Sequence, residues 1–162
     1  MTWFDTARFG MFIHWAPASQ RGWELSWPLV GGSSALPGCQ NVAVDEYHST
    51  AKTFNPVSFD ACAIAQMAKA AGMQYGVLTS KHHDGYAMFH TRTSDYSVEH
   101  SPYGKDIVRQ YLEAFRAEGL RVGLYFSLID WHHPDYPAFT EADKPYRFGR
   151  WRRARPEQWA RF

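Results

Sequence analysis

Cysteine is scarce in this sequence, no long apolar run occurs, and neither sign of charge is in excess. Of the 162 residues only Cys39 and Cys62 are cysteines, so a disulfide framework is excluded, and their spacing is not that of a metal site. No stretch approaches the ~20 consecutive apolar residues of a membrane-spanning helix. With 17 Lys and Arg against 16 Asp and Glu, the net charge of +1 offers no attraction to nucleic acid or to an anionic membrane. We therefore expect one globular domain with neither nucleic acid nor a membrane as its partner.

The two ends of the sequence add little about compartment or partners. Residues 1–5 contain no positively charged region followed by an apolar one, so no signal peptide is visible and the compartment stays open. Near the other end, five arginines surround Trp151, a pattern that can bind single-stranded nucleic acid. The run is short and the rest of the chain is balanced in charge, so we interpret it as a solvated loop. These arginines are Arg147, Arg150, Arg152, Arg153 and Arg155.

Aromatic side chains, in contrast, are abundant. They make up 17% of the chain, with 7 Trp, 9 Tyr and 11 Phe, beside 8 His. That is more than the core of a chain of this size needs, and it favours a cleft in which rings stack against a ligand such as a carbohydrate. A core rich in tryptophan is the alternative explanation.

Hydrophobic patterning predicts three short strands and two helices joined by long loops. The strands are apolar runs that end in a polar residue, and the helices carry an apolar face at helical spacing. In the first helix Ser58 is the expected N-cap, Gly72 the stop, and alanines with Ile64 the buried face. Cys62 is expected on or beside that face as a small apolar filler. The expected strands are 9–15, 75–80 and 121–127, the expected helices 59–71 and 106–118, and residues 16–55 are expected to be irregular.

The second helix–strand unit repeats the first one 47 residues later: a glycine stops the helix, another glycine lies in the strand, and a serine ends it. The pairs are Gly72 and Gly119, Gly76 and Gly123, and Ser80 and Ser127. Short helix-to-strand connections with long strand-to-helix loops predict an α/β fold with a parallel sheet. Apolar strands followed by polar, His-rich loops are typical of a (β/α)8 barrel, whose active site lies in those loops. A doubly wound sheet competes, but no glycine-rich phosphate loop follows the first strand.

The length fits only part of such a barrel. A complete one needs about 250 residues, and only three of its eight strands are predicted here. Pro156 followed by Glu157 has the composition of a helix start, so a third helix is expected to begin near the end of the sequence. We therefore expect residues 1–162 to be the N-terminal portion of a TIM-barrel catalytic domain, its first three β/α units, with two unpaired sheet edges when alone.

The sharpest motif is Lys81-His82-His83-Asp84-Gly85, directly after the second predicted strand. Two imidazoles and a carboxylate at the end of a strand suit either a metal ion or hydrogen bonds to a hydroxylated ligand. Adjacent residues in an extended chain point to opposite sides, so His82 and His83 bind one ion only if the chain turns there. The spaced His-x-His of metal-dependent barrel hydrolases is absent, which favours the hydroxylated ligand. Asp84 is expected to brace the loop. One of the two histidines could also have only this structural role.

Residues that follow the first predicted strand are candidates for the same cleft. His14-Trp15 ends that strand, and His14 shares a rim with the paired histidines if the first two strands are neighbours. Imidazole suits sugar hydroxyls, and tryptophan suits the C–H face of a pyranose. The adjacent Trp23 and Glu24 are a further candidate lining.

Two carboxylates follow the third predicted strand. Asp130 and Asp135 could act as a general acid and its partner. Pro134 and the turn-like spacing favour the other interpretation, in which these carboxylates brace backbone and histidines.

Together these motifs resemble the α-L-fucosidases, family 29 of the glycoside hydrolases. The resemblance runs over nearly the whole chain in the same order, and Lys-His-His-Asp-Gly is its most specific part. It is carried by Trp3-Phe4, residues 7–15, Phe54-Asn55-Pro56, residues 70–73, 78–85 and 105–108, Gly119-Leu120, residues 123–127 and Asp130-Trp131-His132.

The resemblance implies a retaining exo-glycosidase that removes terminal α-L-fucose from an oligosaccharide or glycoconjugate, on a barrel followed by a β-sandwich domain and with no cofactor or metal. The substrate-binding residues that it implies are His14, Trp23, Glu24, His82, His83 and Tyr125. Two features depart from the family: its first-loop pair has the order Glu-Trp, whereas Trp23 precedes Glu24 here, and its Tyr-Tyr pair reads Tyr125-Phe126, with one hydroxyl fewer.

The resemblance also implies that the catalytic carboxylates lie elsewhere. Retaining hydrolysis needs a nucleophile and an acid about 5–5.5 Å apart, and in the family the nucleophilic Asp follows the fourth strand, with the acid/base later still. We therefore expect these residues to form part of the sugar-binding wall without a catalytic carboxylate. A catalytically inactive carbohydrate-binding barrel is one alternative, and a metal-dependent barrel hydrolase is another.

Overall fold

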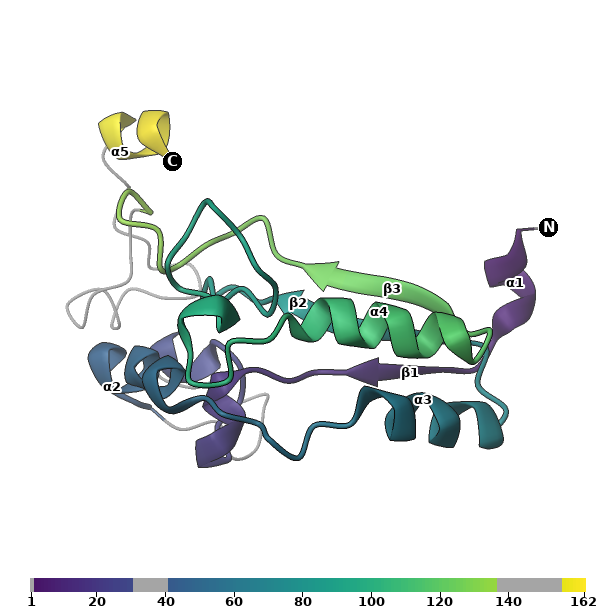
Figure 1. Ribbon diagram of the computed structural model, residues 1–162. Coiled ribbons are helices and arrows are strands. Elements are labelled where there is room, and N and C mark those ends of the chain that lie inside the picture. The colour runs from purple at the N-terminus through teal and green to yellow at the C-terminus, as the bar shows by residue number, and fades with distance from the viewer. Residues whose placement is uncertain (1, 31–40, 137–155) are drawn as a thin grey trace.

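Three parallel strands and two connecting helices form the body of the protein. The computed structural model describes residues 2–30, 41–136 and 156–162. Its sheet has the order β1 (Gly10–Ile13), β2 (Tyr75–Lys81) and β3 (Arg121–Phe126), and every pair is parallel. Helices α3 (Ala61–Ala70) and α4 (Ile107–Ala117) connect these strands and pack on one side of the sheet (Figure 1). The predicted α/β class with a parallel sheet is confirmed.

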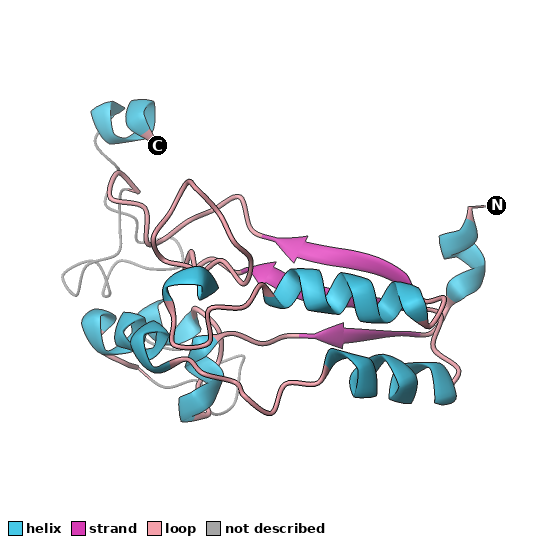
Figure 2. Ribbon diagram, in the orientation of Figure 1, coloured by secondary structure: helices cyan, strands magenta, loops and turns pink. Residues whose placement is uncertain are grey.

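Short helices and loops gather at the edge toward which all three strands point (Figure 2). The expectation that residues 16–55 are irregular is wrong, because several short helical segments lie there. The short elements at that edge are η1 (Pro17–Arg21), η2 (Trp27–Val30), α2 (Val44–Ser49), η3 (Thr50–Thr53), η4 (Val98–His100) and α5 (Pro156–Arg161), whereas α1 (Trp3–Ala7) lies at the opposite end, where the strands begin. The predicted helix start at Pro156 is confirmed. Cys39 and the arginine run at 147–155 lie outside the described residues.

Close packing of α4 on β2 depends on a residue without a side chain. A Cβ on Gly76 would overlap the ring of Phe115, so only glycine lets the helix approach the strand this closely. Since side chains alternate along a strand, Leu78 also faces the helices and is fully buried beside Phe115. The opposite face of β2 carries Thr79, which pairs with Tyr125 of β3.

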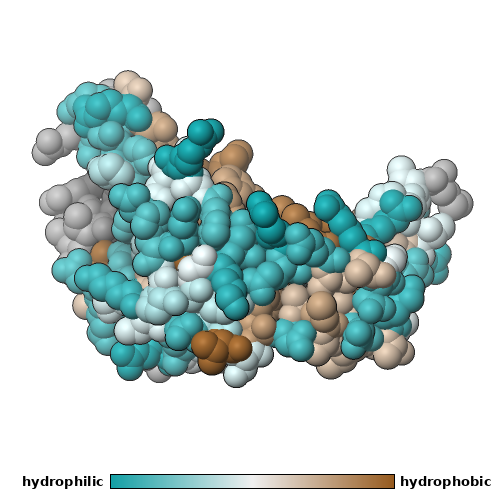
Figure 3. Space-filling view, viewed as in Figure 1, coloured by the Kyte–Doolittle hydropathy of each residue, from teal (hydrophilic) through white to brown (hydrophobic). Residues whose placement is uncertain are grey.

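Apolar side chains remain exposed near the two outer strands. Phe12 on β1 is 56% exposed, and Leu124 and Phe126 on β3 are 46% and 48% exposed. Brown, hydrophobic atoms gather along the β3 side of the molecule in Figure 3. Among the described strands, none pairs with the outer edge of β1 or β3. No helix in the described ranges is long and apolar enough to cross a membrane.

The start of α3 differs from the expected one by two residues. Asp60, not Ser58, is the N-cap, because its Oδ1 accepts the backbone N–H of Ala63 at 2.9 Å. Ser58 lies in a turn that the Phe59 N–H closes on the carbonyl of Pro56. Cys62 is exposed, so its expected role as a buried filler is wrong. The buried stripe of this helix is Ala61, Ala65 and Ala68, and the position after Ala61 lies about 100° around the helix from it.

The two candidate caps predict different costs of substitution. We expect Asp60→Ala to reduce the free energy of unfolding by about 1 kcal/mol, because the Ala63 N–H loses its acceptor. Ser58→Ala is the matched control and should change it by less than about 0.5 kcal/mol, since Ser58 is exposed. Urea unfolding of the two variants checks this. Equal losses would contradict the assignment of the cap.

Candidate functional site

The carboxyl edge of the sheet brings four of the predicted site residues together. His14 follows β1, His82 and His83 follow β2, and Tyr125 lies near the end of β3. The ring of His82 is 4.9 Å from that of His14, 4.4 Å from that of His83 and 5.5 Å from that of Tyr125, centroid to centroid. The prediction that these side chains converge at one mouth of the sheet is confirmed.

The orientation of the paired histidines differs from that of an extended chain. Strand β2 ends at Lys81, and the chain then turns, with the Gly85 N–H donating to the carbonyl of His82 at 3.1 Å. Gly85 has φ +86°, a backbone conformation that residues with a Cβ rarely adopt. The chain thus turns at the motif, which was the stated condition for His82 and His83 to share one side, and their ring centroids lie 4.4 Å apart.

His82 is fixed in one tautomer by a buried serine. Its Nδ1 lies 2.5 Å from the Oγ of Ser26, and that Oγ also accepts the backbone N–H of Asp84 at 2.8 Å. Among the described residues, His82 Nδ1 is the acceptor within reach of the Ser26 proton, so Ser26 donates and Nδ1 accepts. The ring proton of neutral His82 is then on Nε2, which is a hydrogen-bond donor.

His83 has the opposite tautomer for a similar reason. Its Nδ1 lies 2.6 Å from the Oγ of Ser127, whose single proton is donated to the carbonyl of Ile129 at 2.8 Å. Ser127 must therefore accept, so Nδ1 of His83 carries the proton and Nε2 is an acceptor. Nε2 of His82 is thus a donor and Nε2 of the adjacent His83 an acceptor, so the two rings offer both roles to a hydroxylated ligand.

Both of these histidines and His14 are held in the neutral form. Burial, with smaller contributions from the neighbouring His83 and His14, lowers the pKa of His82 to about 3. Burial also lowers the pKa of His83, with a contribution from His14. The pKa of His14 is lowered by burial, against which the carboxylate of Glu24 acts. The tautomers deduced above therefore apply at neutral pH.

Glu24 and Trp23, predicted as neighbours in one lining, lie in different surroundings. An oxygen of Glu24 is 3.7 Å from Nε2 of His14, whose Nδ1 bonds to the hydroxyl of Thr79 at 3.1 Å. Trp23 instead stacks on Tyr47, with centroids 6.3 Å apart and planes at 17°, and packs on a small separate core. The structure thus brings Glu24 to His14 and Trp23 to Tyr47 and the small core.

Two other tryptophans flank the paired histidines. The ring of His83 is 5.2 Å from that of Trp131 and 6.0 Å from that of Trp27. Trp27 was missed by sequence reasoning, since nothing in its spacing marks it. Trp15 packs in the core against Phe54 and Phe59, so it is not a wall of this cleft. The aromatic surplus therefore serves both the core and the cleft.

Asp84 holds the Lys81–Gly85 loop in place through buried hydrogen bonds, as predicted. It is 1% exposed and accepts from the hydroxyl of Tyr47 at 2.6 Å and from the Tyr86 N–H at 3.1 Å. The same Tyr47 hydroxyl accepts the Ser26 N–H at 2.7 Å, which links Asp84 to the serine that orients His82. Burial raises the pKa of Asp84 to about 6 despite these hydrogen bonds.

Asp130, one of the two carboxylates expected to brace the loop after β3, does so. Asp130 accepts from Lys81 Nζ at 2.8 Å and from the backbone N–H groups of His132 and His133 at 3.0 Å each. Asp135 pairs with Arg161 at 2.7 Å. The bracing role of Asp130 is confirmed. Within the described ranges, no group of three or more His, Cys, Asp or Glu is arranged to hold a metal ion.

Comparison with known proteins identifies the family. A family model described as alpha-L-fucosidase matches residues 1–158. The chain is 35% identical over 148 residues to tissue alpha-L-fucosidase of Bos taurus, covering 83% of this chain and 30% of that protein. It is 35% identical over 157 residues to alpha-L-fucosidase of Dictyostelium discoideum, covering 88% and 34%. The chain thus spans about a third of the length of these relatives.

Solved structures agree. Alpha-L-fucosidase isoenzyme 1 from Paenibacillus thiaminolyticus superposes with a TM-score of 0.75 at 45% identity, covering 91% of this chain and 33% of that one. A Bacteroides thetaiotaomicron alpha-L-fucosidase, trapped as a covalent intermediate, gives 0.69 at 33% identity, with 82% and 31% covered. The described sheet and its helices thus share their fold with the corresponding part of these glycoside hydrolases. The chain belongs to the α-L-fucosidase family.

Proposed function

We propose that these residues form one wall of the fucose pocket of an enzyme that hydrolyses terminal α-L-fucose with retention of configuration. The observation that carries this proposal is the pair of neutral histidines with opposite tautomers, His82 as a donor and His83 as an acceptor, beside the rings of Trp27 and Trp131. Such a pair can hold vicinal sugar hydroxyls, and the tryptophans can cover an apolar sugar face.

Two solved relatives support the choice of sugar and the reaction course. An alpha-L-fucosidase of Lactobacillus casei, 37% identical, is in complex with α-L-fucose product. The Bacteroides enzyme is a covalent intermediate obtained with 2-fluoro-fucosyl fluoride. A covalent glycosyl-enzyme is the intermediate of a retaining mechanism. The substrate of the present protein would accordingly be a fucosylated oligosaccharide or glycoconjugate.

We further propose that the sheet consists of the first three strands of a (β/α)8 barrel. Support comes from the parallel order β1-β2-β3 with a helix in each connection, and from polar side chains collected at the carboxyl ends of the strands. The exposed Phe12, Leu124 and Phe126 fit this proposal, since further strands and helices of a barrel would cover them.

Each carboxylate near the paired histidines already has a neighbour within the protein, which argues against a catalytic role for it. Asp84 is buried under Tyr47, Asp130 is paired with Lys81, and Glu24 is beside His14. We therefore assign the described residues to sugar binding and expect the nucleophile and the acid/base to be other carboxylates of the enzyme. His82 and His83 would orient the sugar, while the tryptophans exclude water from it.

The assignment makes a prediction about activity. The isolated 162-residue chain should not turn over an aryl α-L-fucoside, whereas the protein expressed from its complete reading frame should. In that protein we expect His83→Phe to reduce kcat/KM about 100-fold or more, because a buried polar contact to a substrate hydroxyl is lost. His90→Gln, at an exposed imidazole outside the cleft, is the control. Turnover by the isolated chain would contradict the assignment, and fucose binding without turnover by the complete protein would indicate an inactive binding module.

A further inference from the structure

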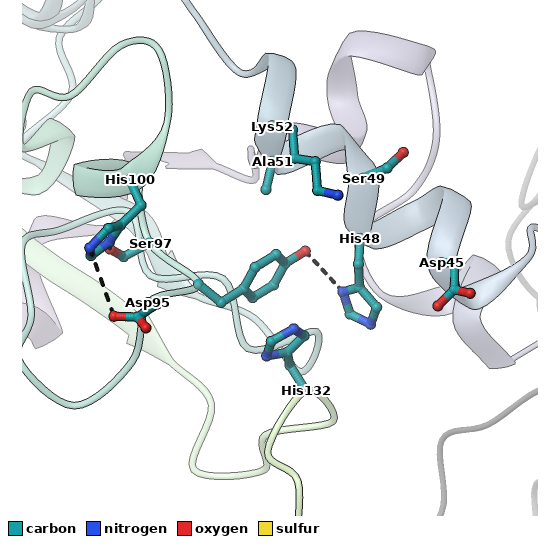
Figure 4. A pocket seen from close by; sticks show the side chains of 10 residues that line it. Asp45, His48, Ser49, Ala51, Lys52, Asp95, Ser97, His100 and His132 are labelled. Atoms are coloured by element: carbon teal, nitrogen blue, oxygen red, sulfur yellow. Dashed lines mark hydrogen bonds and ion pairs between the residues drawn. The ribbon is translucent and has the colours of Figure 1, made fainter.

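A cavity of about 530 Å³ lies apart from His14, His82 and His83, and Figure 4 shows its lining. Its lining comes from α2 and η3, from the loop at 95–100 and from His132. The residue before His132 is Trp131, whose ring faces His83 in the first cleft. The Trp131-His132 turn therefore lies between this cavity and the paired histidines.

That turn is held firmly. Asp130 accepts the His132 N–H at 3.0 Å, and a Cβ on Gly85 would overlap Asp130 and press on the Cβ of His132. The loop after β2 and the loop after β3 thus pack against each other without space between them. A ligand on either side of the turn would meet a preformed wall.

The wall of the cavity combines a ring platform with neutral polar groups. Tyr96 stacks on His132 with centroids 4.1 Å apart and planes at 14°, and His132 as a whole is an exposed residue. Nδ1 of His48 bonds to the Tyr96 hydroxyl at 3.0 Å. Burial lowers the pKa of His48 to about 4 and lowers that of His132 as well, so both rings are neutral and can donate and accept.

The charged groups of the lining have both signs. Lys52 and Asp45 line the cavity from the side of α2 and η3 and Asp95 lines it from the other side, and all three are exposed residues. A site for a polyamine or for a phosphate or sulfate group would be dominated by one sign. Mixed single charges, neutral imidazoles and a ring face together suit a ligand with many hydroxyl groups and no net charge.

We propose that this cavity is a second binding site, which takes a neutral pyranose unit. The ring of His132 would cover its C–H face, and Lys52, Asp95 and His48 would bind its hydroxyls. The inference rests on the proposed function only for the source of the sugar, which is either the remainder of the fucosylated glycan or a separate glycan chain. Since Trp131 and His132 share one turn, a glycan leaving the first cleft over that turn would reach this cavity.

The test uses the protein expressed from its complete reading frame, with ¹⁵N-labelled histidines assigned by His→Gln variants. Saturation with L-fucose should move the ring signals of His82 and His83, and lactose added afterwards should move those of His48 and His132. The first result concerns the proposed function and the second this inference, so either can fail alone. Lactose that leaves His48 and His132 unmoved, or shifts there with spermine or sulfate only, would overturn the proposal.

Exposed residues provide variants that do not threaten folding. We expect Lys52→Met and Asp95→Asn each to weaken lactose binding about fivefold, with L-fucose binding unchanged. Lys69→Met, on the exposed face of α3, should leave both unchanged. Titration with 2′-fucosyllactose distinguishes the two sources of the sugar. If the signals of His82, His83, His48 and His132 all move in one binding event, a single glycan occupies both sites. If only the signals of His82 and His83 move, the sugar in the cavity comes from a separate glycan.

Discussion

Acidification from pH 6.5 to pH 4 will destabilise the folded protein by about 3 kcal/mol through His82 alone. The pKa of His82 is about 3 in the folded protein against 6.5 in the unfolded chain, because burial disfavours the imidazolium. Between these values the unfolded chain binds a proton that the folded one does not. The stability contributed by neutral His82 is therefore fully present above pH 6.5 and is lost as the pH falls. His48, with a pKa of about 4, acts in the same direction.

Asp84 opposes this loss. Its pKa of about 6 is above the unfolded value of 3.8, so the folded protein gains stability as this carboxyl takes up a proton between those values. Urea unfolding at pH 6.5, 5 and 4 checks both signs. His82→Gln should flatten the profile and Asp84→Asn should steepen it. Parallel profiles for the parent and His82→Gln would show that His82 is not held neutral by the fold.

Most of the sheet could be predicted because its signals are local. The apolar runs and the glycines that stop each helix place β2, β3 and α4 within two residues of the expected bounds. The short helices between β1 and α3 could not be predicted, because what holds them is distant in sequence. Tyr47 of α2 is fixed by Asp84 and by the Ser26 N–H, neither of which is near it in the chain.

The candidate site, like the fold, has features that could be predicted from the sequence and features that could not. Its convergence could be predicted, since parallel strands deliver their following residues to one edge of a sheet. The shared orientation of His82 and His83 could not, because it depends on the turn at Gly85 with its positive φ. Nor does any sequence pattern indicate that Ser26 orients His82, since their contact spans 56 residues.

Removal of either orienting serine should change which ring nitrogen of the neighbouring histidine carries the proton. In Ser127→Ala, Nδ1 of His83 loses the hydroxyl that accepts its proton, so the proton becomes free to occupy Nε2. The cleft would then present two donors, and a sugar hydroxyl that donates to His83 in the parent would meet an N–H. We expect L-fucose binding to weaken about tenfold and the ¹⁵N signals of His83 to change tautomer.

Ser26→Ala provides the mirror experiment. Nδ1 of His82 loses its donor and the Asp84 N–H loses a buried acceptor, so Nε2 of His82 no longer carries the proton exclusively and stability falls by about 1–3 kcal/mol. The conservative variants Ser127→Thr and Ser26→Thr keep the hydroxyl and should retain the parent tautomers in whatever fraction folds. A merely structural role of the serines would reduce stability without changing the ring ¹⁵N signals. Unchanged tautomers in folded Ser127→Ala would therefore contradict the donor–acceptor pair on which sugar recognition here depends, whereas a tautomer change with tenfold weaker fucose binding would establish Ser127 as a positioning residue.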